Sequence, residues 1–499
     1  MKNIFYLVFV VALLATSACT DLEETLREDL PEGTTPDPAA LLQGSYDAMR
    51  LPYQDQSRFW AAQQHTSDET IGPTRGGDWD DNGIWRSLHD HSWNADHAFL
   101  TSTFSELLQI VFSTSNLLEF GPDAQTAAEA RLLRAFVMNS VLDGWGQVPF
   151  RPDPTDLLND AEVLGPEETV NFILSELDEI TSVLGNGPAN RANADAARVL
   201  RMKTLLNRGM FLNREAPTFD AADMNEVISI ADQIINSGRY SLSANIFDNF
   251  APNNDQISTE NIFTAENLGG STSGNVRSRW FCTLHYNQNP SGWNGFTTLG
   301  DFYNSFEEGD MRIGVDYPGV TEVAGINVGL LVGPQFDQDG IQILDRFGEP
   351  LAYTPDVAIS ETGSNLEQTG VRVIKYPIDY NNGDNADNDY VYYRLADVML
   401  MQAEAFMRTG SNGQALDIVN EIRSARGAST LASINEEVML EERGRELYWE
   451  GHRRNDQLRF GRFLEAWEEK PASGTERLLF PIPAASLAGN PNLVQNPGY

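Results

Sequence analysis

The chain has 499 residues, 41% of them hydrophobic, and its 34 Lys and Arg against 72 Asp and Glu give a formal net charge of −38. This composition is typical of a soluble globular protein with a large core, in one domain or several. The negative charge argues against binding to nucleic acid or to anionic lipid, because an acidic surface repels both. Neutral molecules and cations are therefore the expected ligands.

The N-terminus has the pattern of a secreted lipoprotein. An apolar run over residues 4–15 is too short to span a bilayer and has the length of a signal-peptide core. Three small residues then precede Cys19, as at the processing site of bacterial lipoproteins, where the thiol becomes acylated. We expect a signal peptide over 1–18, lipidation of Cys19 and a polar tether over 19–37. An ordinary secretory leader is the alternative.

Helical periodicity covers most of the chain up to residue 242. Apolar residues at spacings of three and four predict helices near 38–50, 94–119, 127–143, 166–183, 193–212 and 223–237. No other segment has the length and hydrophobicity of a membrane span, so we expect attachment through the lipid anchor only.

Residues 60–93 interrupt this helical pattern. They contain Gly-rich turns, little periodicity and four tryptophans: Trp60, Trp79, Trp85 and Trp93. The segment predicts a long loop, and long ordered loops often carry function. A second aromatic stretch, residues 279–296, adds the candidates Trp280, Tyr286 and Trp293.

The segment from 243 to 392 has a different composition. Gly, Asn, Asp and Ser are frequent, and apolar runs are short, as at 325–332 and 370–376. This predicts a loop-rich insertion with a few strands. We expect one domain over 38–499, made of a helical scaffold and ligand-side loops. The scaffold covers about 38–58, 94–242 and 393–499, and the loops cover about 59–93 and 243–392.

The rest of the chain is organised around residues 393–426. Residues 395–407 are almost all apolar, which indicates a helix packed on more than one side. Gly410 fits a C-terminal cap, and apolar residues return at helical spacing from Ala415 to Ile422. Two antiparallel helices of this kind are typical of tetratricopeptide-type pairs. An ordinary helical hairpin is the alternative.

Charged residues are dense between 441 and 459. They fall at helical spacing in three pairs, Glu441–Arg445, Glu442–Arg445 and Glu450–Arg454. Such a cluster could be mistaken for a catalytic site. We interpret it instead as a buried ion-pair lattice that pins the C-terminal helix.

Four stretches carry long and specific motifs. They are the helical pair at 393–426, AEARLLRAFVMNSVLDGWGQVPF at 128–150, LEERGRELYWEGHRRNDQLRFG at 440–461 and FPIPAASLAGNPNLVQNPGY at 480–499. In this order they resemble the SusD/RagB family of nutrient-binding outer-membrane lipoproteins. The resemblance implies a mainly α fold, with a tetratricopeptide-like helical-pair scaffold and a long loop-rich insertion containing a few short strands.

The same resemblance implies a lipid-anchored protein exposed on the outer membrane that binds without catalysis. Members of the family capture an oligosaccharide or polysaccharide and deliver it to a SusC-like TonB-dependent transporter. The motifs of nucleophile elbows and phosphate-binding loops are missing from the sequence. Two alternatives stay open: a secreted surface glycoside hydrolase, and a scaffold protein that uses its helical pairs for protein contacts. Fructan, β-glucan and non-glycan nutrients are not distinguished.

The two aromatic loops supply the candidate ligand site. A sugar packs its apolar C–H face on a flat ring, while neighbouring polar groups bind its hydroxyls. We expect Trp79 or Trp85 to stack on the glycan, and the other aromatic candidates are Trp280, Tyr286 and Trp293. Charged groups make the stronger hydrogen bonds, and the expected hydroxyl partners are Asp68, Arg75, Asp78 and Arg372. Cys282 is expected to line the same pocket without reacting, and some tryptophans to plug the core instead.

No cofactor is expected, and the sequence offers two kinds of candidate metal site. Four histidines, His65, His89, His91 and His97, lie in or beside the first aromatic loop. Hydrogen-bonding roles are favoured for them over a zinc site, because no H-E-x-x-H motif is present. Acidic turns at 337–340 and 384–389 are compatible with a structural calcium ion, although neither completes a calcium-loop pattern. Solvated turns are the alternative.

Overall fold

The structure is a computed structural model that describes residues 36–499. The expected signal peptide, the lipidation site Cys19 and most of the tether therefore lie outside the described residues. Residues 38–499 pack as one compact unit. In the part of the chain that the structure describes, every helix is too short or too polar to cross a membrane.

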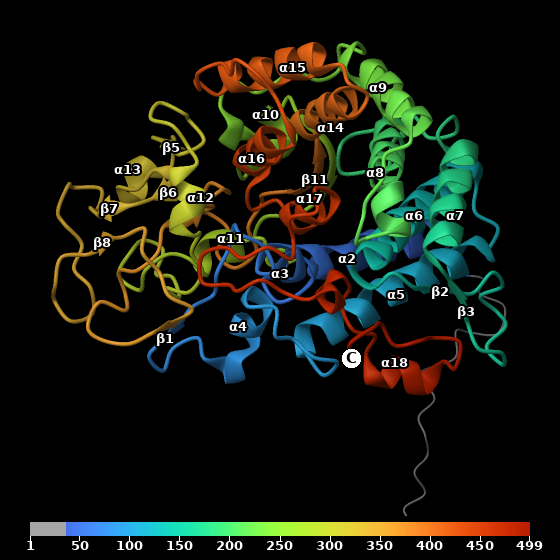
Figure 1. Ribbon diagram of the computed structural model, residues 1–499, viewed down its shortest axis with the longest axis horizontal. Coiled ribbons are helices and arrows are strands. Elements are labelled where there is room, and N and C mark those ends of the chain that lie inside the picture. The colour runs from blue at the N-terminus through green and yellow to red at the C-terminus, as the bar shows by residue number, and fades with distance from the viewer. Residues whose placement is uncertain (1–35) are drawn as a thin grey trace, which may run out of the picture. The chain divides into compact units, whose positions relative to one another are not determined.

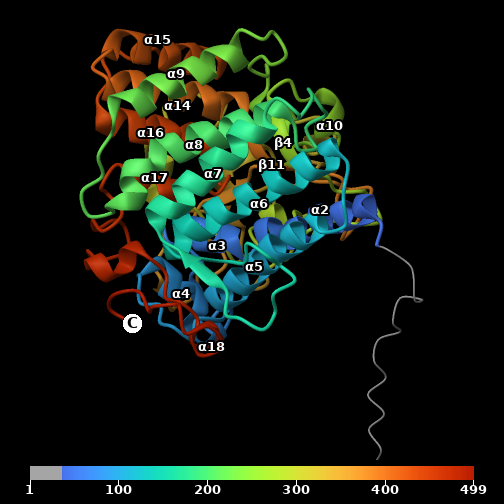
Figure 2. The ribbon, with the colours of Figure 1, turned by 90° about the vertical axis from the view of Figure 1, so that its right-hand side faces the viewer.

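A layered array of helices forms the scaffold (Figures 1 and 2). Successive helices pack on one another from α5 to α9, α14 packs on α9, and α15 packs on α14. The bounds are α2 (Pro38–Gln54), α5 (Ala98–Leu118), α6 (Ala124–Trp145), α7 (Pro166–Ile180), α8 (Ala194–Leu212), α9 (Ala221–Ile235), α14 (Leu395–Arg408) and α15 (Asn412–Ala425). This arrangement confirms the mainly α fold class and the helical pair at 393–426.

Local sequence signals explain where these helices begin and end. Asp123 accepts a hydrogen bond from the Thr126 amide and begins α6, and Asn193 begins α8 in the same way. Such side chains satisfy amide groups that have no partner within the helix. Gly146, at φ 72°, ends α6 in the left-handed region that favours glycine. The predicted helices therefore agree with the structure to within a few residues.

The insertion leaves the scaffold after α9 and returns at α14. Its entry and exit are joined by antiparallel pairing of β4 (Asn261–Ala265) with β11 (Tyr390–Arg394). The runs at 325–332 and 370–376 contain β6 (Val328–Leu331) and β10 (Arg372–Ile374), which also pair antiparallel. The remaining strands are β5 (Gly314–Val315), β7 (Gly333–Pro334), β8 (Ala352–Tyr353) and β9 (Ser360–Glu361). This part of the chain also holds short helical segments: η2 (Ile246–Phe250), α10 (Asn254–Ile257), α11 (Ser278–Phe281), α12 (Gly300–Asn304) and α13 (Thr321–Ala324).

The stretch predicted as one long loop, 60–93, is more structured than expected. It contains α3 (Phe59–Gln64), β1 (Thr74–Arg75), η1 (Asp81–Gly83) and α4 (Ile84–His89). These elements are too short to show helical or strand periodicity in the sequence. β1 pairs in parallel with β9 and so ties this segment to the insertion. In Figure 1, β1 lies on the side of the molecule occupied by β5 to β8.

The C-terminal segment crosses the scaffold. It contains α16 (Glu436–Leu447), α17 (Arg453–Arg459), η3 (Thr475–Leu478) and α18 (Ala484–Gly489). Asn496, in the terminal motif, donates to the carbonyls of Trp145 and Phe480. That contact holds the tail against the end of α6, next to the hairpin of β2 (Val148–Phe150) and β3 (Glu162–Leu164).

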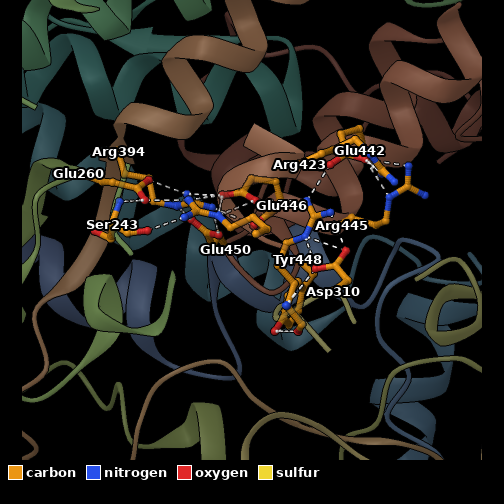
Figure 3. A network of polar contacts seen from close by, with 12 residues as sticks. Ser243, Glu260, Asp310, Arg394, Arg423, Glu442, Arg445, Glu446, Tyr448 and Glu450 are labelled. Carbon is orange, nitrogen blue, oxygen red and sulfur yellow. Dashed lines mark hydrogen bonds and ion pairs between the residues drawn. The ribbon is translucent and has the colours of Figure 1, made fainter. Parts of the chain in front are cut away.

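A buried lattice of ion pairs joins the scaffold to the insertion (Figure 3). Glu446 of α16 pairs with Arg312, Arg394 and Arg426, and Glu260 pairs with the last two of these. All five side chains are at most 1% exposed. The predicted lattice in the charged block is present, and it extends over a longer range than the sequence indicated.

One of the predicted pairs in this block is wrong. Arg445 does contact Glu441 and Glu442. Glu450, however, pairs with Arg394 and Lys375 rather than with Arg454. Arg454 pairs with Asp143 of α6. Glu450 lies in the break between α16 and α17, whereas Arg454 lies within α17, so helical spacing does not bring them together.

Candidate ligand-binding site

Two tryptophans from the two aromatic loops meet at the surface. The Trp79 indole Nε1 donates to the Trp293 carbonyl at 2.9 Å. Their ring centroids lie 6.1 Å apart, with the planes inclined by 57°. Trp293 is 44% exposed and Trp79 is half-buried. We call these two rings the aromatic platform.

The backbone around Trp79 explains how its ring reaches this position. Arg75 and Asp78 exchange backbone hydrogen bonds across a tight turn at the end of β1. Trp79 follows at φ 60°, a left-handed conformation that is costly for a bulky side chain. The ring lies against Gly295, where an added Cβ would be 2.3 Å from the indole. Only glycine at this position allows so close an approach.

Polar groups lie beside the platform. Asp78 Oδ2 accepts a hydrogen bond from the Tyr286 hydroxyl at 3.1 Å and forms an ion pair with Arg346 Nη2 at 3.2 Å. The Arg346 guanidinium stacks over the Tyr286 ring, 3.9 Å from its centroid. Burial and, next, the charge of Asp78 raise the pKa of Tyr286, so its hydroxyl stays protonated at neutral pH. The site thus combines flat apolar rings with donors and acceptors.

Two residues at the edge of this site were not among those predicted from the sequence. Arg346 is held by Asp78, and the neighbouring Phe347 is 72% exposed. They lie on a turn whose Asp345 Oδ1 accepts from the amides of Phe347 and Glu349. The signal that the sequence offers is a Phe before a glycine among polar residues, at 345–349.

Six of the ten predicted site residues are buried or form an ion pair away from the platform. Arg75, Trp85, Trp280, Cys282 and Arg372 are at most 4% exposed, and Asp68 is held by Arg453 at 2.6 Å. Their positions support the loops from beneath, and their side chains do not form part of the exposed platform. The predicted residues that the structure brings together at the surface are Asp78, Trp79, Tyr286 and Trp293.

The contacts of the buried arginines explain why they lie inside. Arg75 pairs with Glu361 at 2.7 Å, in the β1–β9 connection. Arg372 donates to backbone carbonyls and to Asn294 Oδ1, and it stacks on Tyr353. A buried guanidinium needs acceptors of this kind for its N–H groups. Both arginines therefore stabilise the loops that carry the platform.

The other buried candidates act as core residues. Trp85 donates its Nε1 to Asp81 at 2.8 Å and packs against Phe99 and Phe296. Burial raises the pKa of the Cys282 thiol, so the thiolate that would react is disfavoured. The expectation that some tryptophans plug the core fits Trp60, Trp85, Trp93 and Trp280.

Of the four candidate histidines, His89, His91 and His97 form hydrogen bonds, whereas neither ring nitrogen of buried His65 has a hydrogen-bond partner within residues 36–499. His89 contacts the carbonyls of Thr70 and Glu468, and His91 contacts the Thr66 carbonyl and the Ser473 hydroxyl. The acidic turns behave similarly, since Asp337 accepts from the amides of its own turn. Among residues 36–499, no group of three or more His, Cys, Asp or Glu is arranged to hold a metal ion.

An interior cavity of about 100 Å³ lies away from the platform, between α3, α6, α8 and α17. It is lined by paired charges such as Lys203, which contacts Asp397 at 2.6 Å. A cavity of this size has room for a few waters, not for an oligosaccharide. None of the predicted site residues lines it. The exposed platform is therefore the better candidate for a glycan site.

Comparison with known proteins gives a consistent result. The model of the SusD family matches residues 232–476. The starch-binding protein SusD of Bacteroides thetaiotaomicron is 27% identical over 430 residues, which cover 76% of this chain and 74% of that protein. The SusD-like protein P38 of Formosa agariphila is 21% identical, with 92% of this chain and 90% of that protein covered.

Solved structures share the fold. A SusD superfamily protein from Parabacteroides distasonis superposes with a TM-score of 0.73 at 17% identity, covering 93% of this chain and 98% of the other. A laminarin-binding SusD-like protein gives a TM-score of 0.70 at 21% identity, with 93% and 99% covered. Surface glycan-binding protein A of Bacteroides thetaiotaomicron, solved with laminarihexaose, gives 0.68 at 17% identity, with 92% and 98% covered.

Proposed function

Because the chain belongs to the SusD family, we propose that it captures an oligosaccharide at the cell surface and delivers it to a SusC-like TonB-dependent transporter. It acts by binding, without catalysis. The observation that carries the proposal is the surface pair of exposed Trp293 and half-buried Trp79, set beside Asp78 and Tyr286. The names of the similar proteins support it, since they describe binding of starch, laminarin or surface glycan.

The chemistry of the platform suits a sugar. Pyranose rings expose C–H groups that pack on an aromatic face, and their hydroxyls need donors and acceptors nearby. Trp79 and Trp293 supply the faces, while Asp78 and Tyr286 supply the polar groups. The other predicted residues, Asp68, Arg75, Trp85, Trp280, Cys282 and Arg372, act in this proposal as the support beneath the site.

The proposed location is the outer membrane, with the protein exposed to the exterior and held by a lipid on Cys19. The pattern of the first 19 residues supports this part of the proposal. The transporter is proposed from the family alone. Detergent extraction of the native outer membrane, followed by capture of this chain, should recover a TonB-dependent transporter with it. Recovery of the chain alone under several mild detergents would count against that partner.

A glycan panel tests the binding function. Purified protein is titrated by calorimetry with starch, laminarin, fructan and cellulose oligosaccharides, and reducing ends are measured in parallel. We expect one class to bind without cleavage, and Trp293→Ala to lose that binding. Leu158→Ala is the matched control, because Leu158 is a 99% exposed apolar residue on the β2–β3 loop. Release of reducing ends would favour the hydrolase alternative, and binding unchanged in Trp79→Ala and Trp293→Ala would remove the platform from the proposal.

A further inference from the structure

Arg346 is held in place by carboxylates on two other segments. Its Nε donates to Glu367 Oε1, its backbone amide donates to Glu367 Oε2 at 3.0 Å, and its Nη2 contacts Asp78 at 3.2 Å. Within residues 36–499, its Nη1 has no hydrogen-bond acceptor, and the side chain is 46% exposed. One guanidinium nitrogen therefore remains available at the edge of the platform.

The position of this nitrogen relative to the platform is set by stacking. The guanidinium lies over the Tyr286 ring at 3.9 Å, and the Tyr286 hydroxyl donates to Asp78, the residue before Trp79. Arginine stacked on an aromatic ring keeps its planar donors in a fixed orientation. Nη1 is thus presented in the same surface region as the rings of Trp79 and Trp293.

The guanidinium charge is already neutralised by the protein. A ligand carboxylate binds arginine best as a bidentate partner along one edge. Glu367 occupies the Nε edge and Asp78 occupies Nη2, so that mode of binding is taken up by the protein's own carboxylates. A single hydroxyl oxygen, in contrast, needs only the Nη1 donor.

The charged groups around the platform also disfavour an anionic ligand. Six carboxylates lie around the platform and its support: Asp78, Asp80, Asp81, Asp345, Glu361 and Glu367. Four guanidinium groups accompany them: Arg75, Arg86, Arg346 and Arg372. Burial lowers the pKa of His285, which lies in the same cluster, so this histidine is uncharged at neutral pH. The cluster has an excess of two negative charges, which repels an anionic ligand.

We propose that Arg346 binds a hydroxyl of the glycan through Nη1, and that the site selects uncharged glycans over those with carboxylate or sulfate groups. This inference rests on the proposed function, because it names the ligand class of the same site. Glu367 acts as a positioning residue, since it is 3% exposed and contacts Arg346 rather than solvent.

Glu367 ties three segments together. His285 Nδ1 accepts from the Asn287 amide at 3.0 Å, so the ring proton of neutral His285 lies on Nε2 and is donated to Glu367 at 2.8 Å. The same carboxylate holds Arg346 through its backbone and its side chain. Loss of the Glu367 charge should therefore leave the positive charge of Arg346 less neutralised. It does not remove a group that contacts the ligand.

The first test compares matched ligands. Hexasaccharides of glucose, xylose and mannose are titrated beside hexagalacturonate and hexamannuronate, at low salt and at about 1 M salt, where charge effects are screened. We expect a neutral member to bind, and every uronate to bind at least about tenfold more weakly at low salt. Equal or tighter binding of a uronate would overturn this inference and leave the proposed function standing. Absence of binding by every member of this series, and by the starch, laminarin, fructan and cellulose oligosaccharides, would instead overturn the proposed function.

The second test uses variants of Arg346 and of Glu367, the carboxylate that holds it. Arg346→Ala should weaken the neutral ligand by about tenfold, as for loss of a charged hydrogen-bond donor, and circular dichroism should show that the variant is folded. Glu367→Gln keeps the size of the side chain but removes its charge. It should reduce the ratio of neutral to uronate affinity, because only Asp78 then compensates Arg346. A purely structural role of Glu367 would weaken both ligand classes equally, and that result would remove it as a positioning residue for selectivity.

Discussion

Arg426 and Glu446 lie 2.9 Å apart, Nη2 to Oε1, with both side chains shielded from solvent. The same carboxylate contacts Arg394 and Arg312. One side chain of α16 thus connects the end of α15, the end of β11 and the insertion (Figure 3). The helical scaffold and the insertion that carries the platform are joined through this group.

Removal of the Glu446 charge should destabilise the protein strongly. Glu446→Gln leaves three buried arginines with one fewer partner, and breaking a buried pair costs about 3–5 kcal/mol. Chemical denaturation should show this loss in the free energy of unfolding. Glu441→Gln is the matched control, because Glu441 pairs with Arg445 at 3.3 Å but is 48% exposed. We expect the control to change stability by about 1 kcal/mol or less. Equal effects of the two substitutions would contradict the structural role of the lattice.

Asp389 predicts a dependence of stability on pH. It is 3% exposed and accepts from the Asn267 amide and the Thr264 hydroxyl, and burial raises its pKa to about 7. A raised pKa gives stability that is fully present below the carboxyl's ordinary pKa and is lost as pH rises through about 7. We compare the free energy of unfolding of Asp389→Asn with that of the unmodified protein. This difference should favour the variant more at about pH 8 than at about pH 5.

Denaturant titrations of both proteins at the two pH values measure this change. Asp339→Asn, on an exposed turn, serves as the control for removal of a carboxylate. In Asp389→Asn, the new side chain can still accept a hydrogen bond from the Asn267 amide through its carbonyl oxygen. If the difference between variant and unmodified protein is the same at both pH values, burial of a protonated Asp389 is refuted.

The scaffold could be predicted from the sequence because its signals are local. Apolar spacing and caps such as Asp123 and Asn193 act within a few residues of the helix they begin. The partners of the charged groups could not be predicted in this way. Glu450 pairs with Arg394, 56 residues away, and Arg454 with Asp143, 311 residues away. Only the packing of complete elements brings such residues together.

The candidate site was predictable as a region and not residue by residue. Trp85 and Trp293 are the same residue type in similar glycine-containing stretches of the sequence, yet Trp85 is 4% and Trp293 44% exposed. Which ring faces solvent depends on long-range contacts, such as the hydrogen bond from Trp79 to the Trp293 backbone. Arg346 joins the site only because Glu367 and Asp78 hold it there.

The two tryptophans should respond differently to truncation. Trp293→Ala should weaken binding of the cognate glycan by about 2–4 kcal/mol, as for a central aromatic contact, with little change in melting temperature. Trp85→Ala should cost about 3–5 kcal/mol of stability, because it leaves a cavity among Phe99, Phe296 and Trp79. Calorimetry and thermal unfolding separate the two effects. A Trp293 variant that binds normally but unfolds early would reverse this assignment.

The lipid anchor is tested by Cys19→Ser. Two or three acyl chains give firm attachment, at ~0.8 kcal/mol per buried methylene. The variant should move from the membrane fraction to the soluble fraction and lose labelled palmitate. Cys282→Ser is the control, since Cys282 is buried and should leave the fractionation unchanged. Membrane partitioning that persists in Cys19→Ser would exclude the lipid as the anchor.

Gly295 offers the sharpest test of the platform geometry. Gly295→Ala places a methyl group 2.3 Å from the Trp79 indole, so the ring must move while its chemical identity is unchanged. We expect glycan binding to fall by about 2 kcal/mol or more, close to the effect of Trp79→Ala, together with a change in tryptophan fluorescence. Gly77→Ala is the matched control in the same loop region, because nothing lies within 4 Å of its added methyl. It should bind as the unmodified protein does. Normal binding by Gly295→Ala, with an altered fluorescence spectrum, would show that the Trp79 ring moves and does not contact the ligand.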